Sequence, residues 1–163
     1  KTAYEIVDCD WSSDVCSSDL GAATAQAAAD RGWLPVVVGR RASALEEVAA
    51  SCGAAVRAID LSEPDAPDAL VRSVLDEFGR LDGVVANAGV MSVGTVLQTE
   101  PADWDRTMAT NLTSVFRLVR ASLPPLLESR GAIVGVSSIA ALRSPGGAAA
   151  YAVSKAEIGR AHV

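Results

Sequence analysis

The sequence predicts an α/β fold built on a doubly wound parallel sheet, and three observations lead to it. From residue 21 onward, Ala-rich segments with helical spacing alternate with short apolar segments rich in Val. Continuous apolar segments are typical of strands buried on both faces of a sheet. The segments between them are long enough for helices, and a helix joining two such strands gives a right-handed crossover and a parallel sheet. No internal repeat or linker divides the 163-residue chain, so we expect a single domain.

The boundaries of the elements follow from caps, breakers and apolar spacing. Gly32 and Gly53 are expected to end the first two helices, because glycine readily adopts the left-handed conformation at a helix C-terminus. Pro64 and Pro101 suit first helical turns, whereas the two prolines at positions 124 and 125 are expected to kink or interrupt the longest helix. The predicted helices are 21–32, 42–52, 63–79, 101–130 and 149 onward. The predicted strands are 54–60, 81–87, 132–138 and a strand within 33–41 that is bounded by Pro35 and ends at Gly39.

The composition excludes several classes of protein. Half of the residues are hydrophobic and 21% are charged, so the chain is not a disordered tail. No apolar run approaches the roughly 20 residues that cross a bilayer, and no secretory signal pattern is present. The net charge of −6 argues against a nucleic-acid groove, and three Cys with one His suit neither a disulfide framework nor a zinc site. We therefore expect a cytoplasmic protein with no metal site and with no membrane or nucleic-acid partner.

The two ends of the chain differ from the middle. The first twenty residues hold two of the three Cys and five acids, with no clean period. Back-translation of residues 14–20 gives GAC GTG TGC TCT TCC GAT CT. Its reverse complement, with one preceding base, encodes Glu-Ile-Gly-Arg-Ala-His-Val, which is residues 157–163. Two unrelated protein segments should not be reverse complements of each other.

These nucleotides resemble a common short-read sequencing adapter, and residues 1–6 resemble its outer part. We therefore expect residues 1–20 and 157–163 to be non-native, adapter-derived segments, and residues 21–156 to be the natural part of the chain. The discarded ends hold six acids and two bases, so most of the net negative charge would belong to them. A natural divergent terminus is the alternative, and the raw DNA reads around these codons distinguish the two. Tyr4, Ile6 and Val7 nevertheless suit an edge strand, without functional weight.

Two arginines follow the predicted strand that ends at Gly39. Ligands of open α/β sheets bind beyond the carboxyl ends of the strands. In a dinucleotide site, an acid at this position would bind the ribose hydroxyls, whereas an Arg accommodates a 2′-phosphate through bidentate, charge-assisted hydrogen bonds. Arg40 and Arg41 therefore favour NADP over NAD. The alternative is that both are solvated charges at the start of a helix.

Smaller signals follow the next two predicted strands. Asp60, before Leu61, could accept a hydrogen bond from an adenine amine, although an ordinary turn Asp explains it as well. Ala88 and Gly89 are small enough for the backbone to approach a flat cofactor, and Asn87 can brace neighbouring backbone. An ordinary turn after a strand is the alternative for these three.

The last predicted strand ends in Ser137-Ser138, and a Tyr-x-x-x-Lys pair follows it. Tyr151 and Lys155 are four residues apart and lie on one face of the final helix. The cationic Lys155 would favour the phenolate form of Tyr151, so that Tyr151 could give or take a proton near neutrality. Ser138 would hydrogen-bond the reacting oxygen. The pair alone is common by chance, and the serine at the sheet edge makes the pattern more specific.

Together these residues resemble the short-chain dehydrogenase/reductase family, over essentially all of residues 21–156. The matches, in family-like order and spacing, are Asn87-Ala88-Gly89, Asn111 within NLTSVF, Ser138, and Tyr151-Ala-Val-Ser-Lys155. The resemblance implies that residues 21–156 are a partial NAD(P)-binding domain with a Rossmann-like fold. With the two arginines, it also implies an NADP-dependent oxidoreductase that interconverts an alcohol and a carbonyl on a small molecule.

The resemblance also implies roles for four residues. Tyr151 would be the general acid/base, and Lys155 would also bind the nicotinamide ribose. Ser138 would orient the substrate, and Asn111 would hold a water of the proton relay. Without the family, a solvent-exposed Asn in a helix explains Asn111 as well. Family members usually assemble through the long helix and the catalytic helix, so a homo-oligomer is implied.

The chain departs from the family pattern at both ends. The family opens with a strand and T-G-x-x-x-G-x-G, whose backbone holds a pyrophosphate. Here Gly21 matches only the last glycine, and Asp14 and Asp19 would repel a pyrophosphate. Ala86 replaces the first Asn of the family's N-N-A-G, and the strand pair and substrate loop expected after Ala156 are absent.

These departures leave two alternatives open. The fold is expected to be truncated at both ends, so the chain as written could be a catalytically inert fragment that binds NADPH poorly. A binding or regulatory module is the other alternative, against which the intact serine, tyrosine and lysine set counts. The residues present do not set the identity of the substrate.

Overall fold

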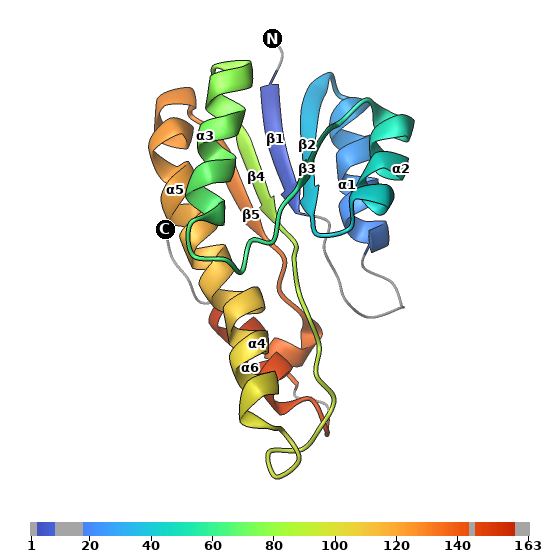
Figure 1. Cartoon of the computed structure of the whole chain (residues 1–163), viewed down its shortest axis with the longest axis vertical. Helices are drawn as coiled ribbons and strands as arrows, with labels where there is room; N and C mark the ends of the chain where they lie inside the picture. The colour runs from blue at the N-terminus through green and yellow to red at the C-terminus, as the bar shows by residue number, and fades with distance from the viewer. Residues whose placement is uncertain (1–2, 9–17, 144–145, 159–163) are drawn as a thin grey trace.

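The computed structural model describes residues 3–8, 18–143 and 146–158. Five parallel strands form one sheet in the order β3-β2-β1-β4-β5, with α1 and α2 on one side and α3 and α5 on the other (Figure 1). The doubly wound parallel sheet is therefore confirmed. The strands are β1 (Ala3–Asp8), β2 (Trp33–Gly39), β3 (Ala55–Ala58), β4 (Gly83–Ala86) and β5 (Ala132–Gly135). The helices are α1 (Ser18–Ala29), α2 (Ala42–Cys52), α3 (Ala66–Phe78), α4 (Pro101–Met108), the π-helix η1 (Ala109–Thr113), α5 (Ser114–Ser129), the 3₁₀-helix η2 (Ile139–Ala141) and α6 (Ala149–Ile158).

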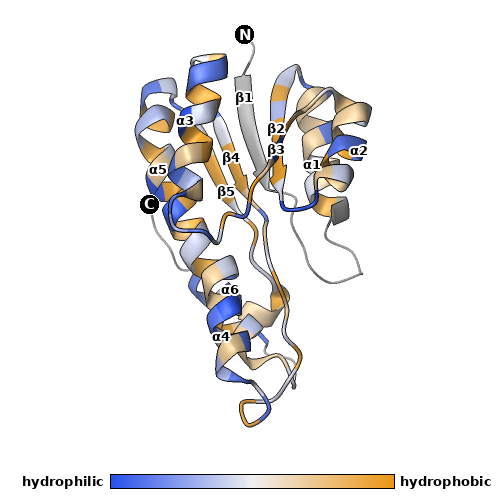
Figure 2. Cartoon of the chain, viewed as in Figure 1, coloured by the Kyte–Doolittle hydropathy of each residue, from blue (hydrophilic) through white to orange (hydrophobic). Residues whose placement is uncertain are grey.

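Alternate residues of β2 show why both faces of the sheet are covered. Val36 and Val38 are fully buried in the core cluster that α3 and α5 complete. Val37, between them, packs in a second cluster with Ala25 of α1 and Leu45 of α2. Strands buried on both faces have continuous apolar sequences, which is the pattern seen here. Figure 2 shows these hydrophobic strands between helices that mix hydrophobic and hydrophilic residues.

The segment around Tyr4, Ile6 and Val7 forms the expected strand, β1, but it lies in the middle of the sheet, so its expected place at an edge is wrong. Val7 pairs with Val37 of β2 on one side and with Val85 of β4 on the other. Strand propensity reflects how side chains fit a pleated surface and does not report a strand's place in the sheet. The adapter-derived origin of residues 1–20 concerns their codons and stays a prediction.

Two helices end at glycines, but the longest predicted helix is not interrupted where its prolines predicted. Gly53 and Gly79 are left-handed C-caps with φ of 72° and 75°. The predicted interruption at residues 124–125 is wrong, because α5 continues through both prolines. Its buried Leu118 and Leu126 pack in the core, and this packing outweighs the hydrogen bonds that proline removes. The helix instead changes at η1, a π-helix for which the sequence has no recognised signal.

β2 ends at Gly39 as predicted, whereas β3, β4 and β5 are shorter than predicted, and the difference matters for the site. Polar residues stand at the carboxyl end of each predicted strand or directly after it. In the structure these residues lie outside the strands and form loops at the carboxyl edge of the sheet. β2 ends before Arg40, β3 before Asp60, β4 before Asn87 and β5 before Ser138. The candidate functional residues therefore lie in loops that a rigid sheet positions.

Gly131, at the start of β5, has no room for a side chain. A Cβ there would overlap the carbonyl group of Asp82 and Cδ2 of Leu126, and the nearby Ala132 N–H donates to the Asp82 carbonyl oxygen at 3.0 Å. We expect Gly131→Ala to lower the free energy of unfolding by about 1–3 kcal/mol, measured by urea denaturation. Gly146→Ala is the control, because a Cβ there meets nothing within 4 Å. Equal midpoints for the two variants would contradict the prediction.

Candidate functional site

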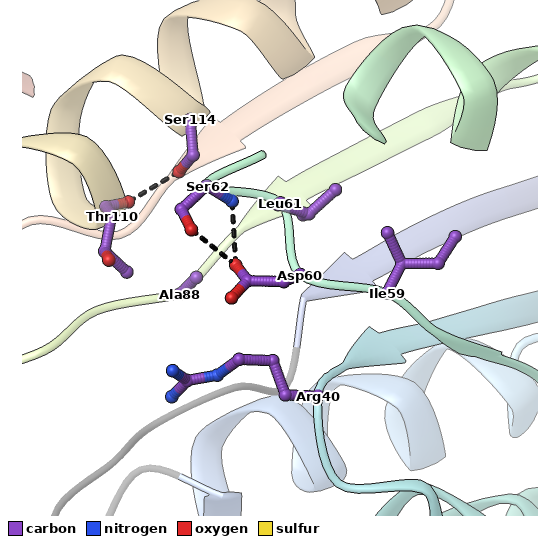
Figure 3. Close-up of a pocket in the computed structure, with 8 residues that line it drawn as sticks. All are labelled: Arg40, Ile59, Asp60, Leu61, Ser62, Ala88, Thr110 and Ser114. Atoms are coloured by element: carbon purple, nitrogen blue, oxygen red, sulfur yellow. Dashed lines mark hydrogen bonds between the residues drawn. The ribbon is translucent and has the colours of Figure 1, made fainter. Parts of the chain in front are cut away.

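A small hollow, with a cavity volume of about 10 Å³, lies at the carboxyl ends of β2, β3 and β4. This edge is where ligands of open α/β sheets bind. In Figure 3, Arg40 and Asp60 extend from neighbouring strand ends toward the hollow, and η1 and α5 contribute Thr110 and Ser114 from across it. The lining residues are Arg40, Ile59, Asp60, Leu61, Ser62, Ala88, Thr110 and Ser114.

The two arginines predicted to bind a 2′-phosphate have different surroundings. Arg40 lines the hollow and is exposed. Arg41 is also exposed, precedes α2 without capping it through its side chain, and is not a lining residue. Arg40 is therefore the better candidate for a phosphate ligand, and the surroundings of Arg41 fit a solvated charge at a helix start.

Asp60 forms the turn that the sequence offered as its alternative role. Its Oδ1 accepts hydrogen bonds from the Ser62 backbone N–H at 2.9 Å and from the Ser62 hydroxyl at 2.7 Å. Among the described residues its Oδ2 has no hydrogen-bond partner, so that oxygen remains available to a ligand in the hollow. Leu61 is buried in the core, so only its backbone can face a ligand. Arg117 Nη1 donates to the Ser62 carbonyl oxygen at 3.4 Å from the far side of this turn.

The segment after β4 is buried throughout. Asn87 is 7% exposed and Ala88 is 4% exposed, and Gly89 is also buried. Ala88 lines the hollow, where its small side chain leaves the backbone accessible. The next residue, Val90, is braced by a side chain from another element.

That side chain is Asn111, whose expected alternative as a solvent-exposed helix residue is wrong. Asn111 lies in η1 and is fully buried. Its Oδ1 accepts from the Val90 N–H at 2.7 Å, and its Nδ2 donates to the Val90 carbonyl oxygen and to Ser154 Oγ, both at 2.9 Å. The amide therefore joins the segment after β4 to α6. Both amide hydrogens of Asn111 are donated to protein groups, and its predicted role in holding a water of a proton relay stays a prediction.

Ser138 and Tyr151 belong to elements that pack together. Ser138 is partly exposed and begins η2, where its Oγ accepts a hydrogen bond from the Ala140 N–H at 3.2 Å. η2 packs against α6, and Tyr151 of α6 is buried in a cluster with Ala140, Ala148 and Ala152. The fold thus brings the loop after β5 to the helix that carries the tyrosine.

Both the side chain and the backbone of Lys155 are hydrogen-bonded to the segment that follows β5. It is 2% exposed, and its Nζ donates to the Val136 carbonyl oxygen at 3.0 Å. Its own carbonyl oxygen accepts from Ser137 Oγ at 2.8 Å. A buried ammonium requires such partners, and this one shares a helix face with Tyr151.

Gly21 lies in the first turn and a half of α1 and is buried. Residues 9–17, which stand where the family has its pyrophosphate loop and which include Asp14, lie outside the described residues. The structure therefore describes the helix that would follow such a loop, and the side chain of Asp19 in that helix is likewise outside the description.

Several residues of the site were not predicted from the sequence. Thr110 and Ser114 line the hollow, and Ser154 binds Asn111. Ser154 lies between Tyr151 and Lys155 in the sequence, so the motif itself contained the signal. The backbone groups of Val90 and Val136 could not be found in this way, because any residue type carries them.

Two further findings concern the described part of the chain. None of its helices is both long enough and apolar enough to cross a membrane. It contains no group of three or more His, Cys, Asp or Glu residues that could hold a metal ion.

A five-stranded parallel sheet in the order 3-2-1-4-5, covered by helices on both faces and hollowed at its carboxyl edge, defines a Rossmann-like fold. A family model described as short chain dehydrogenase matches residues 16–160. The chain belongs to the short-chain dehydrogenase family.

Named relatives in this family are similar to the chain over most of its length. A serine 3-dehydrogenase of Agrobacterium fabrum is 35% identical over 129 residues, which is 77% of this chain and 51% of the relative. A 3beta-hydroxysteroid dehydrogenase of Mediterraneibacter gnavus is 37% identical over 147 residues, 85% of this chain and 52% of the relative. A meso-2,3-butanediol dehydrogenase of Serratia marcescens is 32% identical over 142 residues. The chain spans about half the length of these curated relatives.

Solved structures agree with the fold. A NAD+-bound xylitol dehydrogenase has a TM-score of 0.85 at 26% identity, and the match covers 96% of this chain and 60% of that one. A short-chain dehydrogenase from Streptomyces avermitilis has a TM-score of 0.87 at 28% identity, covering 98% of this chain and 58% of that one.

Proposed function

We propose that the protein is an NADP-dependent oxidoreductase that interconverts an alcohol and a carbonyl on a small molecule. One observation carries the proposal. Tyr151 and Lys155 are both buried on α6, and α6 is hydrogen-bonded to the carboxyl end of β5, which leads into Ser138. This set of groups suits proton transfer to an oxygen at the sheet edge. Activity is measured on the product of the longest genomic open reading frame that contains the codons of residues 21–156, called here the full-length gene product.

The residues around the hollow fit a dinucleotide. Arg40 offers a guanidinium for a phosphate, Asp60 offers a carboxylate oxygen for an amine, and Ala88 allows a flat ring to approach. NADP, when bound, supplies or accepts the hydride. Arg40 and Asp60 would hold its adenosine half, and the segment of Ala88 would support the remainder.

The chain's own residues then move the proton and hold the substrate. Tyr151 Oη transfers the proton to or from the substrate oxygen, and Ser138 Oγ donates a hydrogen bond to the same oxygen. Lys155 supplies a positive charge on the face of α6 that carries Tyr151, and it binds the nicotinamide ribose. Asn111 keeps η1, the segment after β4 and α6 in register.

We also propose that the protein is cytoplasmic and assembles as a homo-oligomer through α5 and α6. Phe116 and Leu127 of α5 are 62% and 71% exposed, and Val153 of α6 is 46% exposed. Large apolar side chains gathered on a helix face are more stable when a partner covers them. The exposure of Phe116, Leu127 and Val153 therefore supports an interface formed by α5 and α6.

Arg40→Ala is expected to weaken NADPH binding by about 10- to 100-fold and NADH binding little, because only NADPH presents the 2′-phosphate to the guanidinium. A hydrogen bond to a charged group contributes about 1.5–3 kcal/mol, which corresponds to this range. Cofactor fluorescence titration of the full-length gene product measures both constants. Arg41→Ala is the matched control, with a smaller expected effect because Arg41 does not line the hollow. Equal losses of NADPH and NADH affinity would exclude Arg40 as the phosphate ligand.

A further inference from the structure

A fully buried serine lies between Tyr151 and Lys155. Ser154 has 0% of its surface exposed. Its Oγ accepts a hydrogen bond from Asn111 Nδ2 at 2.9 Å and donates one to the Tyr151 carbonyl oxygen at 2.8 Å. Since Asn111 also binds the Val90 backbone, the Ser154 hydroxyl joins α6 to η1 and to the segment after β4.

Packing alone does not explain a serine at this position. The buried neighbours Ala150 and Ala152 on the same helix are alanines, with exposures of 0% and 7%. A hydroxyl in such a place is unfavourable unless it is hydrogen-bonded, and here both its donor and its acceptor capacity are used. The contact with Asn111 therefore distinguishes Ser154 from the small apolar residues around it.

The two sides of α6 are held by different bonds. Ser154 fastens the helix to η1, whereas the Lys155 carbonyl oxygen is bound by Ser137 beyond β5. A helix residue is displaced by about 1.5 Å along the axis and by about 100° around it from its neighbour. Hydrogen bonds at two adjacent residues, directed to two different elements, therefore restrain both the rotation and the sliding of α6.

We propose that Ser154 is a positioning residue, whose hydroxyl fixes α6 against Asn111 and so sets where Tyr151 and Lys155 meet the substrate and the nicotinamide. The inference rests on the proposed function. A displacement of about 1 Å in a reacting group can lower a rate by about 100-fold, so a loosened α6 reduces turnover even when the protein stays folded.

Ser154→Ala in the full-length gene product tests this inference. We expect kcat to fall by about 10- to 100-fold, with Kd for NADPH changed by less than about twofold. Ser154→Cys retains a weak donor and acceptor of similar size and is expected to recover part of the loss. Turnover is measured with NADP+ and each of four test substrates: serine, meso-2,3-butanediol, a 3β-hydroxysteroid and xylitol. Thermal unfolding shows that each variant is folded.

Ser122→Ala is the matched control. Ser122 of α5 is equally buried, and its hydroxyl has no hydrogen-bond partner in the described part of the chain. The same substitution there removes an oxygen without breaking a bond, so turnover and cofactor binding stay unchanged. Hydrogen exchange is the readout that needs no turnover: Ser154→Ala frees Asn111 and accelerates exchange of the Val90 amide, whereas Ser122→Ala does not.

The outcomes separate the two proposals. Equal kcat in Ser154→Ala and Ser122→Ala overturns the positioning role and leaves the proposed function standing. If the unsubstituted protein binds NADPH but turns over none of the four substrates, hydrogen exchange of the Val90 amide tests the positioning role. Equal exchange rates in Ser154→Ala and Ser122→Ala then overturn the inference. If that protein neither binds NADPH nor turns over any substrate, the proposed function fails and the inference fails with it.

Discussion

Replacing Tyr151 by Phe is expected to lower turnover of the full-length gene product by about 10²- to 10⁴-fold, the range that general acid–base catalysis contributes. The substitution removes one oxygen and keeps the ring that packs against Ala140, Ala148 and Ala152. NADPH binding should therefore remain nearly intact. Steady-state kinetics and cofactor fluorescence titration measure the two effects separately.

The outcome distinguishes a chemical from a structural role for the tyrosine. A variant with normal NADPH affinity, normal thermal unfolding and almost no turnover agrees with proton transfer by Tyr151. Unchanged turnover would refute the assignment. Loss of NADPH affinity together with turnover would instead indicate that the ring supports the cofactor site.

Asn111→Leu is expected to destabilise the protein strongly, by roughly 2–6 kcal/mol. Leu has a similar size, but it leaves the buried N–H and carbonyl of Val90 without their partners, and each unsatisfied buried group costs about 1–3 kcal/mol. Ser154 loses a donor as well. Urea denaturation, followed by circular dichroism, measures the change in the free energy of unfolding.

Thr107→Val is the control for this experiment. Thr107 is also fully buried, and its hydroxyl donates to the Asp103 carbonyl oxygen within its own helix at 2.7 Å. The substitution is nearly isosteric and removes this bond together with the hydrogen bond between Thr107 Oγ1 and Ser92 Oγ at 3.2 Å. At about 0.5–1.5 kcal/mol for each bond, we expect a loss of about 1–3 kcal/mol. Equal losses in the two variants would show that the bonds of Asn111 to Val90 are not special to this position.

The sequence was sufficient for the fold class because its main signal is physical and local. Three adjacent valines in β2 predict a strand buried on both faces, and Gly53 predicts a helix end with φ above zero. The place of β1 within the sheet was not predictable, since it depends on which backbone edges meet in three dimensions. The π-helix at Asn111 was missed for a similar reason, because the buried bonds of its side chain to distant backbone support it.

The candidate site, like the fold, was predictable from the sequence only in part. Side-chain chemistry at strand ends singled out Arg40, Asp60 and Ala88, which line one hollow, and their binding roles stay predictions. It could not separate Arg40 from Arg41, because adjacent residues differ in direction and this depends on the turn that follows the strand. It also could not foresee that the Lys155 ammonium binds a backbone carbonyl, since backbone groups are the same at every position.

One consequence concerns β5. Within the described ranges it pairs with β4 alone, and its Val134 is 53% exposed. Its outer side therefore presents a row of backbone donors and acceptors, together with an apolar side chain, in the extended form that another polypeptide strand can join. In a concentrated sample of this chain, such an edge favours intermolecular strand addition and aggregation unless another segment covers it.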